Sequence, residues 1–176
     1  PAEFNAGNFG FASTLLETLK KHGNKCPVML SSSIQATLAG RFGTSEYGLS
    51  KRAGEDLFFS YAEETGAKVL VYRFPNLVGK WVKPNYNSAV GTFCNNIAND
   101  LPITVNDPTV ELEMLFIDDL IEEMFDALEG KEHHCEFDGV NTVLTGNGRY
   151  CAAPVTHKAT LGYIVECLHK FHDQPS

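Results

Sequence analysis

The sequence has no long apolar run and no excess of positive charge. Its apolar stretches, such as residues 69–72, fall far short of the ~20 residues that a membrane-spanning helix needs. The 14 Lys and Arg residues against 22 Asp and Glu residues give a formal charge of −8. This balance argues against a surface that follows nucleic-acid phosphates and against an anionic membrane face. We therefore expect neither nucleic acid nor membrane among the partners.

Clustered cysteines are also absent. The five cysteines are widely scattered and never spaced as Cys-x-x-Cys, so they indicate neither a disulfide framework nor a zinc ribbon. His133, His134 and Cys135 are adjacent, but their irregular spacing in a glycine-rich stretch argues against a metal site. The chain opens at Pro1 without a readable secretion signal. We expect the protein to bind no metal. We also expect it to reside in the reducing environment of the cytoplasm.

What is present is ordinary globular composition: 176 residues, 43% apolar and 20% charged, enough for one domain or slightly more. Apolar periodicity predicts helices at residues 8–22, 45–65, 88–99, 118–129 and after Thr160. Short apolar runs predict strands at residues 27–31, 68–73, 103–105 and 113–117. Residues 75–87 and most of 130–156 are expected to be loop. This alternation predicts an α/β fold with a mainly parallel, Rossmann-like sheet and flanking helices.

Tyr47 and Lys51 are the most informative pair of polar residues. They lie four residues apart on a predicted helix, so both side chains project from one face. A phenol is a poor acid at neutral pH, but a neighbouring ammonium lowers its pKa. Such a pair can exchange a proton with a carbonyl or a hydroxyl group, although the Tyr-x-x-x-Lys spacing also occurs often by chance.

Two further polar residues follow predicted strands. Ser33 ends the run Ser31-Ser32-Ser33 after the first strand, and Asn76 follows the strand that ends near Arg73. Parallel α/β sheets place ligands just beyond the carboxyl ends of their strands. Taken alone, Ser33 could equally be a strand-end cap, and Asn8 near the first helix could be a helix N-cap.

Along the chain, a strand that ends in Ser33 is followed by the helix with Tyr47 and Lys51 and then by a strand that precedes Asn76. In this order the sequence resembles the extended branch of the short-chain dehydrogenase/reductase family, over nearly the whole chain. The runs Leu30–Thr37 and Arg73–Asn87 (RFPNLVGKWVKPNYN) are similar to the bifunctional capsular-polysaccharide enzymes that make UDP-2-acetamido-2,6-dideoxy-β-L-talose. In those enzymes a reductase domain uses NADPH to reduce a C4 ketone. A separate C-terminal cupin domain performs the preceding epimerisation.

The resemblance implies a role for each residue of the catalytic group. Tyr47 matches the catalytic acid/base, and Lys51 matches the residue that lowers the pKa of that tyrosine and holds the nicotinamide ribose. Ser33 matches the hydroxyl that hydrogen-bonds the reacting oxygen. Asn8 matches the asparagine that holds a water beside the lysine.

The resemblance also implies a sugar-nucleotide pocket lined by Asn76, Lys83, Asn85 and Asn87. Asn76 would in addition contact the cofactor, and Lys83 would pair with the pyrophosphate. The alternative for Lys83 is an ordinary solvated surface lysine.

Three departures from the family pattern matter. The Gly-x-x-Gly-x-x-Gly turn that binds a dinucleotide is missing, because Gly7 with Gly10 and Gly40 with Gly43 lack a third glycine and follow no apolar strand. We therefore expect NADP to bind through a glycine-rich motif outside this chain, and the native protein to be longer at its N-terminus. Leu112 stands near the position of an arginine that clamps phosphate in many members. No cupin sequence follows the last residue.

One absence favours reduction over dehydration. Related 4,6-dehydratases follow the catalytic hydroxyl residue with acidic groups, whereas Ser33 is followed by Ile34, Gln35 and Ala36. Hydride transfer needs a positioned cofactor and one proton donor.

We therefore expect part of an NADPH-dependent nucleotide-sugar reductase of capsule biosynthesis. Residues 1–74 would form the C-terminal part of a Rossmann domain that carries the catalytic residues. Residues 75–176 would form mainly the substrate-binding region. The alternatives are a nucleotide-sugar 4-epimerase and a non-catalytic module that binds or dimerises. By resemblance, a homo-oligomer would form through helices 8–22 and 45–65.

Overall fold

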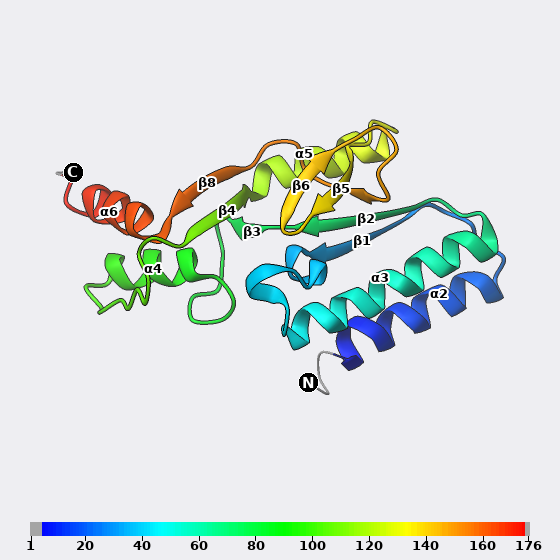
Figure 1. Ribbon diagram of the computed structural model, residues 1–176, viewed down its shortest axis with the longest axis horizontal. Coiled ribbons are helices and arrows are strands. Elements are labelled where there is room, and N and C mark those ends of the chain that lie inside the picture. The colour runs from blue at the N-terminus through cyan, green and yellow to red at the C-terminus, as the bar shows by residue number, and fades with distance from the viewer. Residues whose placement is uncertain (1–4, 175–176) are drawn as a thin grey trace. The chain divides into compact units, whose positions relative to one another are not determined.

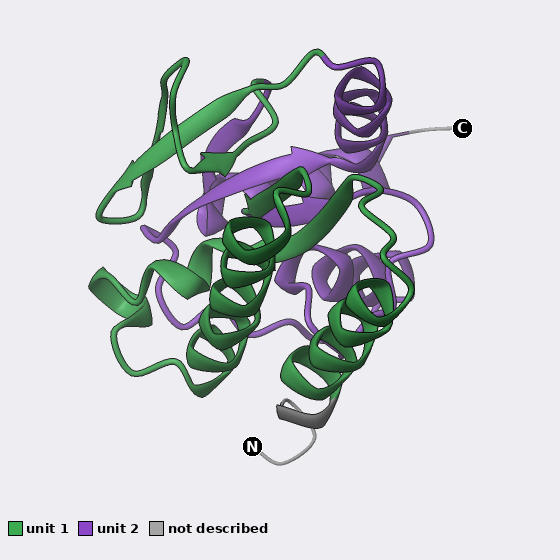
Figure 2. Ribbon diagram, turned by 90° about the vertical axis from the view of Figure 1, so that its right-hand side faces the viewer, with its two compact units in different colours: residues 1–74, 131–154 green, residues 75–130, 155–176 purple. Residues whose placement is uncertain are grey.

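The computed structural model of the chain describes residues 5–174. The fold has two units: residues 1–74 with 131–154 form unit 1, and residues 75–130 with 155–176 form unit 2 (Figure 2). Each unit combines a sheet with flanking helices, which confirms the predicted α/β class. No helix within residues 5–174 is long and apolar enough to cross a membrane.

Unit 1 contains a five-stranded sheet in the order β1-β2-β7-β5-β6. Its strands are β1 (Val28–Ser33), β2 (Val69–Phe74), β5 (His134–Asp138), β6 (Asn141–Leu144) and β7 (Tyr150–Cys151). β2 is parallel to both β1 and β7, whereas β5 is antiparallel to both β7 and β6. The sheet is therefore mixed, with its parallel part at the strands that carry the predicted site. The β1–β2 register sets Ser33 beside Phe74.

The helical segments of unit 1 are η1 (Asn5–Gly10), α2 (Phe11–Lys21), η2 (Ile34–Thr37), η3 (Gly40–Phe42) and α3 (Glu46–Thr65). α2 and α3 run side by side (Figure 1), and α3 also contacts β1 and β2. Leu16 of α2, Phe58 of α3 and Val71 of β2 meet in one buried apolar cluster. Burial of such side chains contributes about 1.5–3 kcal/mol each, which holds α3 against the sheet.

Unit 2 contains a three-stranded sheet in the order β3-β4-β8. Its elements are β3 (Asn76–Val78), α4 (Ala89–Ala98), β4 (Glu111–Phe116), α5 (Ile117–Leu128), β8 (His157–Thr160) and α6 (Leu161–His172). β4 is parallel to β3 and antiparallel to β8. The Thr160 hydroxyl accepts a hydrogen bond from the Tyr163 amide, which confirms Thr160 as the N-cap of α6.

Three sequence expectations were wrong. Residues 130–156 carry three strands instead of mostly loop, residues 75–87 contain β3, and residues 103–105 form no strand. β5 and β6 form a hairpin whose tight turn has Gly139 at φ +60°. Gly139 occupies the first of the two turn positions, where a type II′ turn requires glycine. A glycine in this glycine-rich stretch therefore marks a hairpin turn.

Candidate active site

The start of α3 is fixed by a hydrogen-bonded cap. The Ser45 hydroxyl accepts a hydrogen bond from the Gly48 amide at 2.9 Å and donates to Gln35 Oε1 at 2.8 Å. Ser45 thus joins the first turn of α3 to η2. Because Tyr47 lies in that turn, its backbone is held relative to the end of β1, from which η2 continues.

Gly48 allows the same turn to approach η2 closely. A Cβ atom at this position would lie 2.3 Å from the backbone oxygen of Gln35, a distance that real Cβ atoms essentially never show. The contact is with backbone, so a rotated side chain cannot relieve it. The sequence Tyr47-Gly48 therefore reflects a packing requirement beside the predicted acid/base.

The structure brings Lys51 and Tyr47 together. Lys51 Nζ lies 5.7 Å from the centroid of the Tyr47 ring and donates a hydrogen bond to the Ser31 carbonyl oxygen at 3.2 Å. Burial lowers the pKa of Lys51, and the Glu55 carboxylate partly opposes that shift. The predicted pair therefore shares one helix face and is tied to the strand that carries Ser33.

Ser33 is the last residue of β1. Its hydroxyl oxygen accepts a hydrogen bond from the Gln35 amide at 3.2 Å and caps η2. The capping alternative is thus observed, and it is compatible with the catalytic one because a hydroxyl that accepts can also donate its own proton. Gln35 connects Ser33 to Ser45 at the start of the Tyr47 helix.

Asn8 also reaches the Tyr47 helix. Its side-chain Nδ2 donates to Ser50 Oγ at 3.0 Å, and Ser50 in turn donates to the Tyr47 carbonyl oxygen at 2.8 Å. The N-cap position of α2 is occupied by Gly10, so Asn8 does not cap that helix. The residue lies within η1 and contacts α3 beside Lys51.

The predicted substrate residues lie in unit 2. Asn76 is on β3, and its amide Nδ2 donates to the Glu113 carbonyl oxygen of β4 at 3.0 Å. The Asn85 amide donates to Thr92 Oγ1 at 2.9 Å, and Asn85 has a left-handed backbone with φ +55°. Lys83, Asn85 and Asn87 are all exposed.

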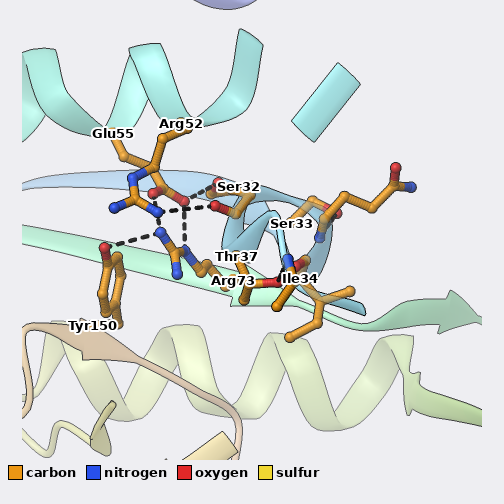
Figure 3. Close-up of polar contacts among 11 residues, drawn as sticks. Ser32, Ser33, Ile34, Thr37, Arg52, Glu55, Arg73 and Tyr150 are labelled. Carbon is orange, nitrogen blue, oxygen red and sulfur yellow. Dashed lines mark hydrogen bonds and ion pairs between the residues drawn. The ribbon is translucent and has the colours of Figure 1, made fainter. Parts of the chain in front are cut away.

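A buried polar network was missed by the sequence analysis. Arg73 donates to both carboxylate oxygens of Glu55, from Nε at 2.9 Å and from Nη2 at 2.6 Å, and Nη2 also donates to the Tyr150 hydroxyl at 2.9 Å. The Ser32 hydroxyl donates to Glu55 Oε1 at 2.5 Å. Figure 3 shows these four side chains linked between α3, β1, β2 and the strand of Tyr150.

Two signals could have revealed this network. Arg73 ends a strand that the apolar pattern predicts to be buried, and a buried guanidinium requires a carboxylate partner. Glu55 lies four residues after Lys51, on the same face of a helix already predicted to bear the site.

Stacking and charge complete the network. The Arg73 guanidinium carbon lies 3.9 Å from the centroid of the Tyr150 ring. Burial raises the pKa of Tyr150, while the Arg73 charge acts in the opposite direction. The phenol therefore stays neutral and serves as a hydrogen-bond acceptor for Arg73.

No cluster of three or more His, Cys, Asp or Glu side chains that could hold a metal is present among residues 5–174. His134, which the sequence analysis weighed as a ligand, faces the Gly148 carbonyl oxygen at 3.0 Å and Glu132 Oε2 at 2.9 Å instead.

Known proteins resemble this chain in sequence and in fold. The chain is 41% identical over 131 residues to a UDP-2-acetamido-2,6-beta-L-arabino-hexul-4-ose reductase from Pseudomonas aeruginosa, a match that covers 74% of this chain. The crystal structure of the capsular polysaccharide assembling protein CapF from Staphylococcus aureus matches with a TM-score of 0.75 and 41% identity over 92% of this chain. The chain spans 34% of the length of the first protein and 39% of the second.

More distant structures share the fold. A UDP-glucose 4-epimerase from Thermus thermophilus, in complex with NAD, matches with a TM-score of 0.70 at 17% identity over 93% of this chain and 53% of its own. Residues 1–137 match the family described as the NAD dependent epimerase/dehydratase family. The predicted resemblance is confirmed, and the chain belongs to the NAD dependent epimerase/dehydratase family.

Proposed function

We propose that this chain carries the catalytic residues of an NADPH-dependent enzyme that reduces the C4 ketone of a nucleotide-activated deoxy-acetamido sugar, for capsular or cell-surface polysaccharide. The observation that carries the proposal is the placement of Lys51, which lies beside the Tyr47 ring and is bonded to the strand that ends at Ser33. The 41% identity to a 4-ketose reductase supports the substrate class.

In this proposal each residue acts on one proton or one oxygen. Tyr47 donates a proton to the oxygen of the ketone as it becomes an alkoxide, and the Ser33 hydroxyl hydrogen-bonds the same oxygen. The Lys51 charge stabilises the phenolate that remains on Tyr47 and so lowers the pKa of the phenol. Asn8 steadies the helix beside Lys51 through its hydrogen bond to Ser50.

The residues present fit one end of a nicotinamide cofactor, which supplies the hydride when bound. The half-buried Lys51 ammonium and the Tyr47 hydroxyl would hydrogen-bond a ribose hydroxyl. By the resemblance, Asn76 would also contact the cofactor. Gly7 and Gly10 lie in η1 rather than in a strand-to-helix turn, so they do not form a pyrophosphate cradle. The pyrophosphate-binding glycines are expected outside this chain.

The sugar-nucleotide side of the proposal rests on the segment from Asn76 to Asn87. Lys83 would pair with the pyrophosphate, and Asn76, Asn85 and Asn87 would hydrogen-bond the sugar and nucleotide. Lys83 lies 5.3 Å from the Tyr86 ring centroid, and both side chains are exposed. This position leaves the ammonium accessible to a phosphate.

The experiment uses the full-length protein, which includes the expected cofactor-binding part, and compares Tyr47→Phe with a matched control, Tyr163→Phe, on the exposed face of α6. The substrate is the UDP-linked 4-keto sugar, and NADPH consumption is followed by its absorbance. We expect Tyr47→Phe to lower kcat by about 10²–10⁴-fold, the usual contribution of a general acid, and Tyr163→Phe to leave it unchanged. An unchanged rate for Tyr47→Phe would remove the catalytic proposal.

The same assay separates the alternatives. A 4-epimerase would interconvert sugar isomers with no net consumption of NADPH. A non-catalytic module would bind the sugar nucleotide without turnover.

Self-association through α2 and α3 remains a prediction. Phe11 and Leu15 of α2 and Leu49 of α3 are exposed large apolar side chains. They would supply an apolar surface for a second copy, which sedimentation of the protein would detect.

A further inference from the structure

Glu55 is the centre of the buried polar network. Its side chain is 0% exposed and accepts three hydrogen bonds: from Ser32 Oγ, from Arg73 Nε and from Arg73 Nη2. A carboxylate is retained in such a place only when its charge is compensated and its oxygens are satisfied. Both conditions are met here.

One helix face makes two consecutive attachments to β1. Lys51 donates to the Ser31 carbonyl oxygen, and Glu55, one turn later, accepts from the Ser32 hydroxyl. The next residue of the strand is Ser33. A shift of α3 along β1 would break both attachments and change the position of the Tyr47 helix relative to the strand that ends at Ser33.

The opposite side of Glu55 is closed by groups from two other strands. Arg73 belongs to β2 and is 4% exposed, and it is stacked on the ring of Tyr150 from β7. Glu55 therefore connects α3 to β1 directly and to β2 and β7 through Arg73 (Figure 3).

We propose that Glu55 is the positioning residue of the catalytic group: its buried carboxylate holds the Lys51 face of α3 in register with the strand end Ser31–Ser33. The proposal rests on the proposed function, because Tyr47, Lys51 and Ser33 are its catalytic group. Glu55 acts through these residues and does not itself contact substrate.

The electrostatics agree with this geometry. Burial lowers the pKa of Lys51, and the Glu55 carboxylate is the neighbouring charge that raises it again. The other charged or titratable groups around the site are Arg52 on α3, Arg73 on β2 and the neutral Tyr150 on β7. Arg52 is directed to the Ala36 carbonyl oxygen, to which its Nη1 donates at 3.2 Å.

The test measures Lys51 directly by NMR titration of its side-chain ammonium in the full chain, with Lys51→Arg used to assign the signal. In Glu55→Gln we expect the pKa of Lys51 to fall further, because the carboxylate that raises it is lost. Tyr150→Phe removes a hydrogen bond from the same network but keeps the carboxylate, so it should leave that pKa unchanged. Equal pKa values in Glu55→Gln and the parent chain would overturn the proposal.

Glu55→Gln leaves Arg73 buried without a partner and can fail to fold. The double variant Glu55→Gln with Arg73→Met removes both charges and keeps similar volumes, an exchange that buried ion pairs often tolerate. Loss of the Arg73 charge acts in the opposite direction on the pKa of Lys51, so we expect a smaller fall in this variant than in Glu55→Gln. An unchanged pKa in the folded double variant would show that the pair is structural only.

A second readout separates this inference from the proposed function. If the chain's enzyme reduces the 4-keto sugar, Glu55→Gln should lower kcat more than it raises KM and move the alkaline limb of the rate profile to lower pH. Glu55→Asp should restore part of the rate. Absence of reductase activity in the parent protein would reject the proposed function, while the titration of Lys51 would still decide the role of Glu55.

Discussion

Unit 1 holds Glu55 and Arg73 away from solvent, whereas the Lys170–Glu166 pair of unit 2 stands at the surface of α6. The Glu55 and Arg73 side chains are 0% and 3% exposed, and those of Lys170 and Glu166 are 66% and 58% exposed. A buried pair is costly to desolvate and fixes its elements in one arrangement, whereas an exposed pair adds little to stability. Unit 1 thus uses charge to fix geometry.

The residues proposed for function also differ in burial between the two units. In unit 1, Ser33 and Lys51 are half-buried and hydrogen-bonded to neighbouring backbone. In unit 2, Lys83 and Asn87 are exposed on a loop whose backbone is held by the Asn85–Thr92 hydrogen bond. A reacting group needs a fixed position, whereas a group that binds a variable ligand benefits from side-chain freedom. This difference is consistent with the proposal that unit 1 carries the chemistry and unit 2 the recognition of the sugar nucleotide.

The largest expected effect is on the free energy of unfolding, when the buried Glu55–Arg73 pair is broken by one substitution and the exposed Lys170–Glu166 pair serves as the control. Arg73→Met leaves the Glu55 carboxylate buried and unpaired, which should cost about 3–5 kcal/mol of unfolding free energy. Lys170→Met in unit 2 should leave the urea midpoint unchanged, because both side chains of that pair are solvated. Urea unfolding followed by circular dichroism gives both values. Similar losses for the two variants would abolish the contrast between the units.

A second contrast lies within α3 and concerns two glycines. Gly48→Ala forces a Cβ to within 2.3 Å of the Gln35 oxygen, so α3 must move away from η2, at a cost of about 2–3 kcal/mol. Gly54→Ala meets only the Asn8 carbonyl oxygen at 3.5 Å, an ordinary contact, and should gain up to ~1 kcal/mol from helix propensity.

Amide hydrogen exchange of η2 and the first turn of α3 locates the effect. Faster exchange there in Gly48→Ala, with no change in Gly54→Ala, is expected. Equal exchange in the two variants would contradict the tight packing that we derive for the Tyr47 turn.

In unit 2, Gly91 is also closely packed, but against the side chain of Val82. A second substitution should therefore relieve the clash that a larger residue at Gly91 causes. In Gly91→Ala the new Cβ would lie 2.6 Å from Val82 Cγ1, which should cost about 1–2 kcal/mol and loosen the loop around Lys83. Adding Val82→Ala provides the missing space and should recover most of that loss. A double-mutant cycle on urea unfolding measures the recovery, and simple additivity of the two losses would show that the loop is not anchored there.

Local patterns predicted the helices well. The extent of α3, the glycine that ends it and the Thr160 cap of α6 are properties of short segments, and the structure confirms them. The pairing of β7 with β2 joins Cys151 to Tyr72 across nearly half the chain, and no local pattern encodes it. Gly148 shows why the region looked irregular: a Cβ there would lie 2.2 Å from the Cys135 oxygen, so this glycine allows two strands to approach.

The residues of the candidate site also differ in whether a local pattern can predict them. Tyr47 and Lys51 were found because four residues make one helical turn, and Ser33 because it ends a strand. The bonds of Glu55 to Ser32 and Arg73 span 23 and 18 residues, and that of Arg73 to Tyr150 spans 77. Such contacts follow from the order of strands in the sheet, which the sequence alone does not specify.

The smallest expected effect is on the acid dependence of stability. It is tested at two carboxylates that differ in burial, Glu132 in unit 1 and Glu166 in unit 2. Partial burial by itself raises the pKa of Glu132, but hydrogen bonds from Lys68 and His134 outweigh it, and the net pKa is lowered. A carboxylate with a lowered folded-state pKa stabilises the fold above its unfolded value near 4.5, and that stability is lost as the pH falls through the folded pKa.

Glu132→Gln should therefore lose less than ~1 kcal/mol at neutral pH and show a flatter fall in stability below pH ~4.5. Glu166 in unit 2 also has a lowered pKa, through its hydrogen bond with Lys170, but it is solvated. Glu166→Gln should leave the acid limb unchanged once salt screens the pair. Thermal unfolding across the acid range at two salt concentrations distinguishes these outcomes. Only a carboxylate that is shielded from solvent keeps its interactions at high ionic strength. A salt-independent change for Glu166→Gln, or a change that salt abolishes for Glu132→Gln, would therefore contradict the expectation that the unit 1 carboxylate is the better shielded of the two.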